Sequence, residues 1–453
     1  MSRRVVVVGG GAIGCTTALR LVQAGCSVTL LEAATELGGL ASSWSLDAPT
    51  ATSGSVVWDR FYHVILESDS AWRSVLKELE LDHTIVWSKT RTGACSKGVT
   101  RSVSSPLDLL RFTPLSLISR IRVGITVVVA SRLRDGHSLE LRPLEPWLKK
   151  WSGRKAFEKF WRPQLRAKLG AQSADVSVAF IWATAQRLLR ARRSGVGTER
   201  FGYVPGGYAT ILGRFQEALV DAGVVIRTQA KVRSIESSER DDAPTTEAGR
   251  VVVTLCDGTA IRADDAVLTV PASRLGSMLG GCSQTELHRL DEIRFQGVIC
   301  VSLLLCEPLS PFYLTYLLDE SVLTGIVDMS ALVGGTELGG HGLVYLPRYQ
   351  SPDDPLFDAA DDDVIEMFVK ALGQAYPEFD RGSVVSAKVA RAREVFAVPT
   401  LGYSALVPPT STSIPGVWLI TSAQIEQATL NVDESVRVAE SGVKAVLRER
   451  VRT

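Results

Sequence analysis

A glycine-rich segment near the N-terminus has the residue types and the spacing of a dinucleotide-binding turn. Gly9-Gly10-Gly11-Ala12-Ile13-Gly14 follows the pattern G-x-G-x-x-G and comes directly after the apolar run Arg4–Val8. Gly9 permits a tight turn, Gly11 lets the backbone approach a pyrophosphate, and Gly14 lets a helix lie close to the preceding strand. The free N–H groups at the start of that helix favour phosphate binding.

The elements that must position this turn follow in the expected order. A helix is predicted from the glycine motif to about Gln23, and Gly25 ends it. Ser27–Leu31 then reads as a second buried strand that leads into Glu32, 23 residues after Gly9. A carboxylate at this distance can accept hydrogen bonds from a ribose. Strand, helix, strand and acid together predict that this segment binds a dinucleotide.

The residues after Glu32 separate NAD from FAD. Gly38-Gly39 and Ser42 follow Glu32 at a spacing that resembles the E-x(5)-G-G-x-x-S/T extension of the flavin-containing amine oxidase superfamily. This superfamily includes monoamine and polyamine oxidases, protoporphyrinogen oxidase, phytoene desaturases and UDP-galactopyranose mutase. The resemblance implies FAD, with backbone amides of the glycine pair near its phosphates. Non-covalent binding is expected, because no cysteine follows Cys306, in the region where some oxidases tether the flavin.

Later segments carry the same resemblance. Phe201–Tyr208 resembles the segment where such chains re-enter the FAD domain, and Ala266–Pro271 resembles a buried strand beside the flavin. Val232 matches the residue whose backbone contacts the adenine. Relatives have Gly-Asp near the C-terminus, where this chain reads Ser422-Ala423-Gln424. Gln424 or Asn431 is expected to replace that aspartate.

The resemblance implies an α/β fold with a Rossmann-type, GR2-like FAD-binding domain and an inserted α+β substrate domain. The expected FAD domain comprises 1–88, 200–282 and 396–453, and the expected substrate domain comprises 89–199 and 283–395. The expected cofactor contacts are Gly9, Gly11, Ala12, Ile13, Gly14, Glu32, Ala33, Gly39, Leu40, Ala41, Asp59, Phe61, Val232, Pro271, Ser422, Gln424 and Asn431.

A short aromatic segment is the first candidate for catalysis. Trp58-Asp59-Arg60-Phe61-Tyr62-His63 lies where relatives place residues against the flavin ring, and His63 is one of only five histidines. An imidazole with its free pKa of about 6.5 can move a proton at neutral pH. A hydrogen-bonded structural histidine is the alternative. Tyr62 is a second candidate, and Tyr345 and Arg348, near the end of an apolar run, are candidates for substrate contact.

Charge and hydropathy limit the partners. Lys and Arg number 50 and Asp and Glu 49, so no global field draws the chain to nucleic acid. Basic residues gather between Arg111 and Lys168; solvated helix faces explain them, and the alternative is that some of them hold an anionic small-molecule substrate. Leu107–Leu117, beside this basic run, is a candidate for contact with a membrane surface. No apolar run approaches the roughly 20 residues that a spanning helix needs, and the oligomeric state is not indicated.

The cysteines and histidines indicate the compartment and the absence of a metal site. The seven cysteines are odd in number and never form a Cys-x-x-Cys pair. This pattern is typical of free thiols in a reducing compartment, so a cytoplasmic location and no metal site are expected. A signal peptide is not expected either, because the first apolar run breaks at Gly9-Gly10-Gly11.

These features predict an FAD-dependent oxidoreductase: an oxidase, dehydrogenase or desaturase that passes a hydride from a small organic substrate to flavin N5. The alternative is a redox-neutral flavoenzyme, such as a UDP-galactopyranose-mutase-like sugar mutase or a cyclase. Gly297–Leu305 matches the strand on which many amine oxidases carry a lysine near the flavin, and it contains none. This weakens the expectation of amine oxidation itself. A binding protein that retains FAD as a structural element is a third interpretation.

Overall fold

The computed structural model describes residues 2–49, 51, 54–133, 136–192, 200–237, 249–426 and 429–448. Its first sheet has five parallel strands in the order β19-β13-β1-β2-β9. The most central strand is apolar and buried on both faces, as parallel strands covered by helices are. The strands are β1 (Arg4–Val8), β2 (Ser27–Leu31), β9 (Val225–Arg227), β13 (Asp265–Leu268) and β19 (Val417–Leu419).

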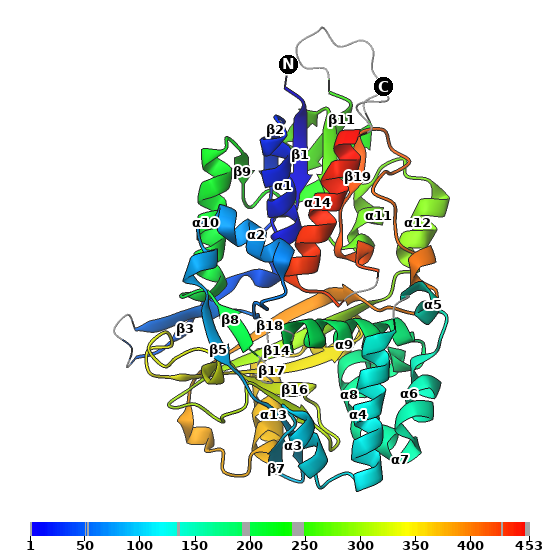
Figure 1. The fold of residues 1–453 in the computed structure, drawn as a ribbon. Coiled ribbons are helices and arrows are strands. Elements are labelled where there is room, and N and C mark those ends of the chain that lie inside the picture. The colour runs from blue at the N-terminus through cyan, green and yellow to red at the C-terminus, as the bar shows by residue number, and fades with distance from the viewer. Residues whose placement is uncertain are drawn as a thin grey trace.

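Two different layers cover this sheet (Figure 1). One face packs against helices that share a single hydrophobic cluster: α1 (Ala12–Gln23), α2 (Ser70–Glu78), α10 (Gly207–Asp221) and α14 (Val432–Arg448). The other face packs against an antiparallel sheet and two short helices: β10 (Val232–Ser237), β11 (Val251–Leu255), β12 (Ala260–Ala263), α11 (Leu275–Met278) and α12 (Gln284–Asp291). The α/β, Rossmann-type expectation is confirmed.

A second sheet of seven strands lies below the first in Figure 1, in the order β18-β14-β17-β16-β15-β6-β7. Every neighbouring pair in it is antiparallel except β15 and β6. Its strands are β6 (Thr92–Ser96), β7 (Val99–Ser102), β14 (Phe295–Leu305), β15 (Leu314–Leu317), β16 (Gly325–Asp328), β17 (Gly342–Gln350) and β18 (Val384–Ala397).

The two faces of the second sheet also differ. Helix α13 (Asp361–Ala375) packs on one face, where its apolar side chains share a cluster with β14 and β17. The opposite face shares a cluster with β3 (Ser43–Asp47) and β4 (Ser55–Asp59). Two further strands, β5 (Val86–Lys89) and β8 (Arg200–Tyr203), pair with each other where the chain leaves and re-enters the region of the first sheet.

A group of helices lies beside the second sheet, at the end of the molecule opposite the first sheet (Figure 1). Its core contains Phe157, Phe160 and Trp161, which are buried as their helical spacing predicts. The helices are α3 (Pro106–Arg111), α4 (Leu117–Arg132), α5 (Gly136–Glu140), α6 (Leu144–Ser152), α7 (Arg154–Ala156), α8 (Arg162–Leu169) and α9 (Val178–Arg192). No helix in the part of the chain that the structure describes is long and apolar enough to cross a bilayer.

Candidate active site

A cavity of about 1720 Å3 runs from the first sheet, past β14, β15, β17 and β18 of the second, to α4 and α9. Ligand pockets usually measure roughly 300–1,000 Å3, so this one has room for a dinucleotide and a substrate together. Its walls come from segments far apart in the sequence, including the β1–α1 turn, the start of β10, the strand β18 and the start of α14. The cavity is therefore a product of the tertiary fold.

The β1–α1 turn forms one wall of the cavity. Gly9 has a φ of 107°, which favours glycine, and a Cβ on Gly14 would lie 1.8 Å from the carbonyl oxygen of Gly9. A Cβ on Gly11 would meet nothing closer than 4.0 Å, because Gly11 faces the cavity with Ala12 and Ile13. Gly11 is the N-cap of α1 and has no side chain to cap it, so the N–H groups of the first turn remain available for a phosphate.

Glu32 lies at the end of β2 and its orientation is fixed by the backbone around it. Its carboxylate accepts hydrogen bonds from the N–H groups of Gly10, at 2.7 Å, and Ala34, at 2.8 Å. Both Glu32 and Ala33 line the cavity. A carboxylate oxygen can accept more than one hydrogen bond, so each oxygen keeps a lone pair for a ribose hydroxyl.

The glycine pair at positions 38 and 39 lies against the same turn. Gly38 donates its N–H to the carbonyl oxygen of Gly10 at 2.8 Å, and a Cβ on Gly39 would lie 3.3 Å from the Cα of Gly11. Both glycines have positive φ values. Gly39, Leu40 and Ala41 line the cavity next to the turn.

The C-terminal wall distinguishes the two expected replacements for the family's aspartate. Asn431 lines the cavity, and its Oδ1 accepts the N–H of Glu434 at 3.0 Å, which caps the start of α14. Gln424 does not line it: its Nε2 donates to the carbonyl oxygens of Pro408 and Leu419 at 3.1 and 3.2 Å. Gln424 therefore stabilises its own loop. The expected contacts Ser422, Val232 and Pro271 also line the cavity.

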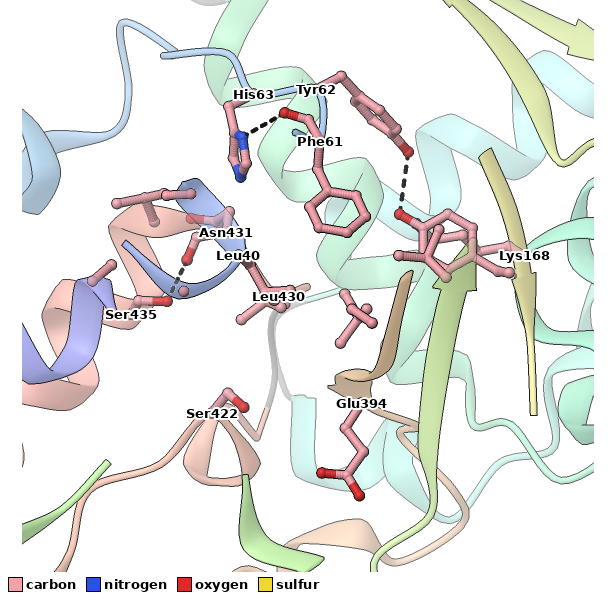
Figure 2. A pocket seen from close by; sticks show the side chains of 18 of the residues that line it. Leu40, Phe61, Tyr62, His63, Lys168, Glu394, Ser422, Leu430, Asn431 and Ser435 are labelled. Atoms are coloured by element: carbon pink, nitrogen blue, oxygen red, sulfur yellow. Dashed lines mark hydrogen bonds between the residues drawn. The ribbon is translucent and has the colours of Figure 1, made fainter. Parts of the chain in front are cut away.

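Phe61, Tyr62 and His63 reach into the cavity from one loop, across from Ser422 (Figure 2). Nδ1 of His63 lies 2.8 Å from the carbonyl oxygen of Phe61. A carbonyl can only accept, so Nδ1 carries the proton and Nε2 is left as an acceptor. Burial lowers the pKa of His63 to about 4. The imidazole is therefore neutral at pH 7, which corrects the expectation that it titrates near 6.5.

Asp59 lies beneath this loop and not in the cavity wall. Its Oδ1 accepts the N–H of Tyr208 at 2.8 Å, and its Oδ2 lies 3.8 Å from Nδ1 of His63. Burial raises the pKa of Asp59 to about 7. The structure thus places Asp59 as a link between β4 and the start of α10, and the cavity does not reach the carboxylate that was expected to contact the cofactor.

Two tyrosines and a lysine form a polar group within the cavity. The hydroxyl oxygens of Tyr62 and Tyr349 are 3.1 Å apart, which is the dashed line that starts at Tyr62 in Figure 2. Nζ of Lys168 lies 3.5 Å from the centre of the Tyr349 ring. Burial, with the neighbouring Tyr349, raises the pKa of Tyr62 well above its ordinary value, so that hydroxyl stays protonated. No carboxylate of the described residues pairs with Lys168.

Neither Tyr345 nor Arg348 lines the cavity. Tyr345 is fully buried and donates its hydroxyl to the carbonyl oxygen of Asp59 at 2.6 Å. Arg348 donates to Oε1 of Gln350 at 2.7 Å and to the carbonyl of Val322 at 3.2 Å. The neighbour that does line it, Tyr349, was not a candidate. The period of two in strands signals this difference, because Arg348 and Tyr349 must point to opposite faces of β17.

The basic run from Arg111 to Lys168 also contains residues that line the cavity and residues that do not. Arg120 donates to the carbonyls of Leu110 and Leu115, and Arg122 donates to the carbonyls of Lys150 and Trp151. These arginines stabilise the helical group at its surface. Lys168, at the other end of the run, is the member that lines the cavity.

A family model described as flavin containing amine oxidoreductase matches residues 14–425. The chain belongs to this family. Membership of the flavin amine oxidoreductase family accounts for the features of the cavity wall. The cofactor of this family is FAD, and FAD binding uses a glycine turn, an acid for the ribose and helix N-termini, as found here. This chain is therefore an FAD-dependent oxidoreductase.

Solved structures share the fold of this flavin amine oxidoreductase. An Exiguobacterium sp. 255-15 protein assigned as a protoporphyrinogen oxidase has a TM-score of 0.75 at 16% identity, with 99% of each chain covered. Reduced UDP-galactopyranose mutase has a TM-score of 0.73 at 17% identity, covering 98% of this chain and 96% of its own. Putrescine oxidase bound to putrescine has a TM-score of 0.70 at 16% identity, with 99% of each chain covered. No curated protein matches the sequence.

Proposed function

We propose that this enzyme oxidises a small, largely apolar organic molecule that carries one polar group, with non-covalently bound FAD as the hydride acceptor. The observation that carries the proposal is the continuity of the cavity. The cofactor signature around Gly11 and Glu32, the polar group around Lys168, and apolar side chains of α4 and α9 all line the same space. When bound, the flavin supplies a two-electron acceptor.

The walls beyond the tyrosines suit an apolar substrate body. Leu109, Val123, Val127, Phe160 and Ile181 line this part of the cavity. Pockets of this kind bind ligands by apolar contact and orient them through a few polar groups. The Tyr62–Tyr349 pair and Lys168 would provide that orientation, because they donate hydrogen bonds and a positive charge to an oxygen or a carboxylate.

His63 would act as a hydrogen-bond acceptor for the substrate. Its Nδ1 proton is held by Phe61, so Nε2 can accept from an N–H or O–H group of a substrate. With a pKa of about 4, this nitrogen is unprotonated throughout the neutral range. We assign Nε2 of His63 the role of holding the N–H or O–H group next to the reacting carbon of the substrate, since correct orientation contributes strongly to rate.

The expected location in a reducing compartment is part of this proposal. All seven cysteines are free in the structure, and Cys15, Cys26, Cys95 and Cys300 are buried. Free thiols persist where disulfide formation is suppressed. For the expected anionic substrate, we propose that Lys168 is the residue that binds the negative charge.

The test is anaerobic reduction of the flavin. The purified, FAD-loaded protein would be mixed under argon with a panel of amines, alcohols, carboxylates and cyclic hydrocarbons that carry one polar group. We expect at least one member to bleach the visible flavin absorbance. Lys168→Met should slow that bleaching, whereas Lys159→Met, which removes an exposed lysine from the adjacent π-helical turn, should not.

A redox-neutral reaction would give a different result. A mutase or cyclase would bleach with no member of the panel, and would convert its substrate only after the flavin had been reduced with dithionite. That outcome would replace the proposed oxidation by the alternative, although FAD and the fold would be unchanged. Equal bleaching rates in Lys168→Met and the wild type would remove the lysine from the proposed site.

A further inference from the structure

The helices α3 and α4 present an apolar surface to solvent. Leu107 and Leu110 on α3 and Leu117, Ile118, Ile121 and Ile125 on α4 are exposed, and Ile118 is 72% exposed. We call this surface, together with Val128 and the arginines beside it, the α3–α4 face. Apolar residues scattered singly are ordinary on a protein surface, but a contiguous group marks a binding surface.

Helix α4 is apolar on two sides. Its inner stripe, Ser119, Val123, Thr126 and Ala130, is buried, as a helix that packs on a core requires. Its outer stripe, Leu117, Ile121, Ile125 and Val128, recurs at the same helical interval and faces solvent. A helix that is apolar all round is normally covered on both sides. The outer stripe therefore needs an apolar environment that the described chain does not supply.

The charges beside the outer stripe indicate what that environment is. Arg111 follows Leu107 by four residues, Arg122 follows Ile118 by four, and Arg132 extends the outer stripe by one turn; all three are exposed. Helix α4 contains no Asp or Glu between Leu117 and Arg132. An apolar centre with a basic rim is complementary to a bilayer surface that contains anionic lipids.

The cavity reaches the surface at these same two helices. Pro106 and Val128 are exposed and also line the cavity, and Leu109 and Gly124 line it between them. A Cβ on Gly124 would lie 3.9 Å from Cδ2 of Leu109, so little separates α3 from α4 at this point. The far end of the cavity from the cofactor signature thus opens beside the α3–α4 face.

We infer that the α3–α4 face docks on a membrane surface rich in anionic lipid, and that the substrate enters the cavity from the bilayer between α3 and α4. The inference of docking depends only on the α3–α4 face. The inference of substrate entry from the bilayer rests on the proposed function, and it restricts the substrate to a molecule that partitions into lipid.

Vesicle sedimentation tests the docking with the FAD-loaded full chain. We expect binding to phosphatidylcholine vesicles that contain phosphatidylglycerol, and weaker binding to phosphatidylcholine alone. The triple variant Leu117→Ser, Ile118→Ser, Ile121→Ser should lower the partition coefficient about tenfold or more, because it removes three apolar side chains that would be buried in the bilayer. Val220→Ser with Val225→Ser, exposed at the other end of the molecule, is the matched control and should bind as the wild type does.

The charged rim needs its own variant. Arg111→Gln with Arg132→Gln should weaken binding to the anionic vesicles and leave the residual binding to phosphatidylcholine unchanged. Wild-type protein that stays in the supernatant with both vesicles would overturn the docking. So would a triple variant that binds like the wild type, or a concentration-dependent dimer that the triple variant abolishes, since a second copy would then cover the face. Retained flavin colour in every variant separates these outcomes from failure of the cofactor site.

Entry between α3 and α4 is tested with N-phenyl-1-naphthylamine, whose fluorescence rises in apolar cavities. Gly124→Trp should reduce the enhancement several-fold by narrowing the gap beside Leu109. Gly213→Trp is the matched control, because a Cβ at that helical glycine meets nothing within 4 Å. Equal enhancement in both variants would show that apolar molecules do not enter between these helices.

Discussion

The carboxylate of Asp59 and the imidazole of His63 approach within 3.8 Å, and burial shifts their pKa values in opposite directions. The pKa of Asp59 rises to about 7 and that of His63 falls to about 4. The shifts have one cause, since burial favours the uncharged form of each group. Between pH 4 and 7 both groups are therefore neutral, and the loop that carries His63 rests on an uncharged support.

Asp59 should make the protein less stable as the pH rises. Its folded pKa, about 7, lies above its unfolded value, so its contribution is full below pH 4 and is lost as the pH rises through 7. We expect wild-type FAD-free protein to lose a few kcal/mol of stability, relative to Asp59→Asn, between pH 4.5 and 8. Urea unfolding at both pH values measures this. Asp47→Asn, exposed on the paired strand β3, is the control and should change with pH as the wild type does. The same pH dependence in Asp59→Asn as in the wild type would refute the raised pKa of Asp59.

His63 should have the opposite dependence. Its folded pKa, about 4, lies below the unfolded value of about 6.5, so its contribution is full above pH 6.5 and is lost as the pH falls towards 4. At pH 5 the wild type should have lost about 2 kcal/mol relative to His63→Asn. Asparagine can still donate to Phe61, so the loop should keep its shape. An NMR titration of the imidazole with a midpoint near 6.5 would contradict this result.

Glu32→Ala should weaken FAD binding without unfolding the protein. A hydrogen bond to a charged group contributes roughly 1.5–3 kcal/mol, so the dissociation constant should rise about ten- to a hundredfold. Flavin fluorescence quenching measures it. Glu32→Gln keeps one accepting oxygen, so its dissociation constant should lie between those of the wild type and Glu32→Ala. Glu36→Ala, which removes an exposed acid from the same loop, should leave the dissociation constant unchanged. An unchanged affinity in Glu32→Ala would show that the acid does not bind the ribose.

Two alanine substitutions in the glycine motif should fail in different ways. Gly14→Ala places a Cβ 1.8 Å from the carbonyl oxygen of Gly9, so it should separate α1 from β1 and lower the melting temperature of the FAD-free protein. Gly11→Ala meets nothing closer than 4.0 Å, so the FAD-free protein should melt nearly as the wild type does while FAD affinity falls. Calorimetry and a binding titration distinguish the two. Equal melting temperatures would remove the packing role of Gly14.

Local signals predicted the first strand, the helix and the second strand of the N-terminal unit well. The turn at Gly9–Gly14 and the acid at Glu32 belong to one short unit of strand, helix and strand, so their positions follow from the order of residues. The choice between Gln424 and Asn431 did not follow from order. It depends on the carbonyls of Pro408 and Leu419, which the fold brings to the side chain of Gln424.

The proposed substrate end of the cavity was less predictable, because it is assembled from distant segments. Tyr62 and Tyr349 are 287 positions apart, and no local pattern pairs their hydroxyl groups. Lys168 was one of many basic residues, and only the packing of α8 near β17 distinguishes it from its neighbours. The pKa of His63 depends on burial by the whole cavity wall, which the sequence does not display.

The order of the strands in the first sheet has a consequence for biosynthesis. Strand β2 ends at Leu31, and β19 begins at Val417, 417 − 31 = 386 positions later. At roughly 5–20 residues per second, the ribosome needs about 20–80 seconds after it completes β2 to reach the start of β19. Until then the nascent chain has its glycine turn but lacks the wall that carries Ser422 and Asn431. Cofactor loading should therefore be a late event, and cells short of riboflavin should accumulate full-length but unloaded enzyme.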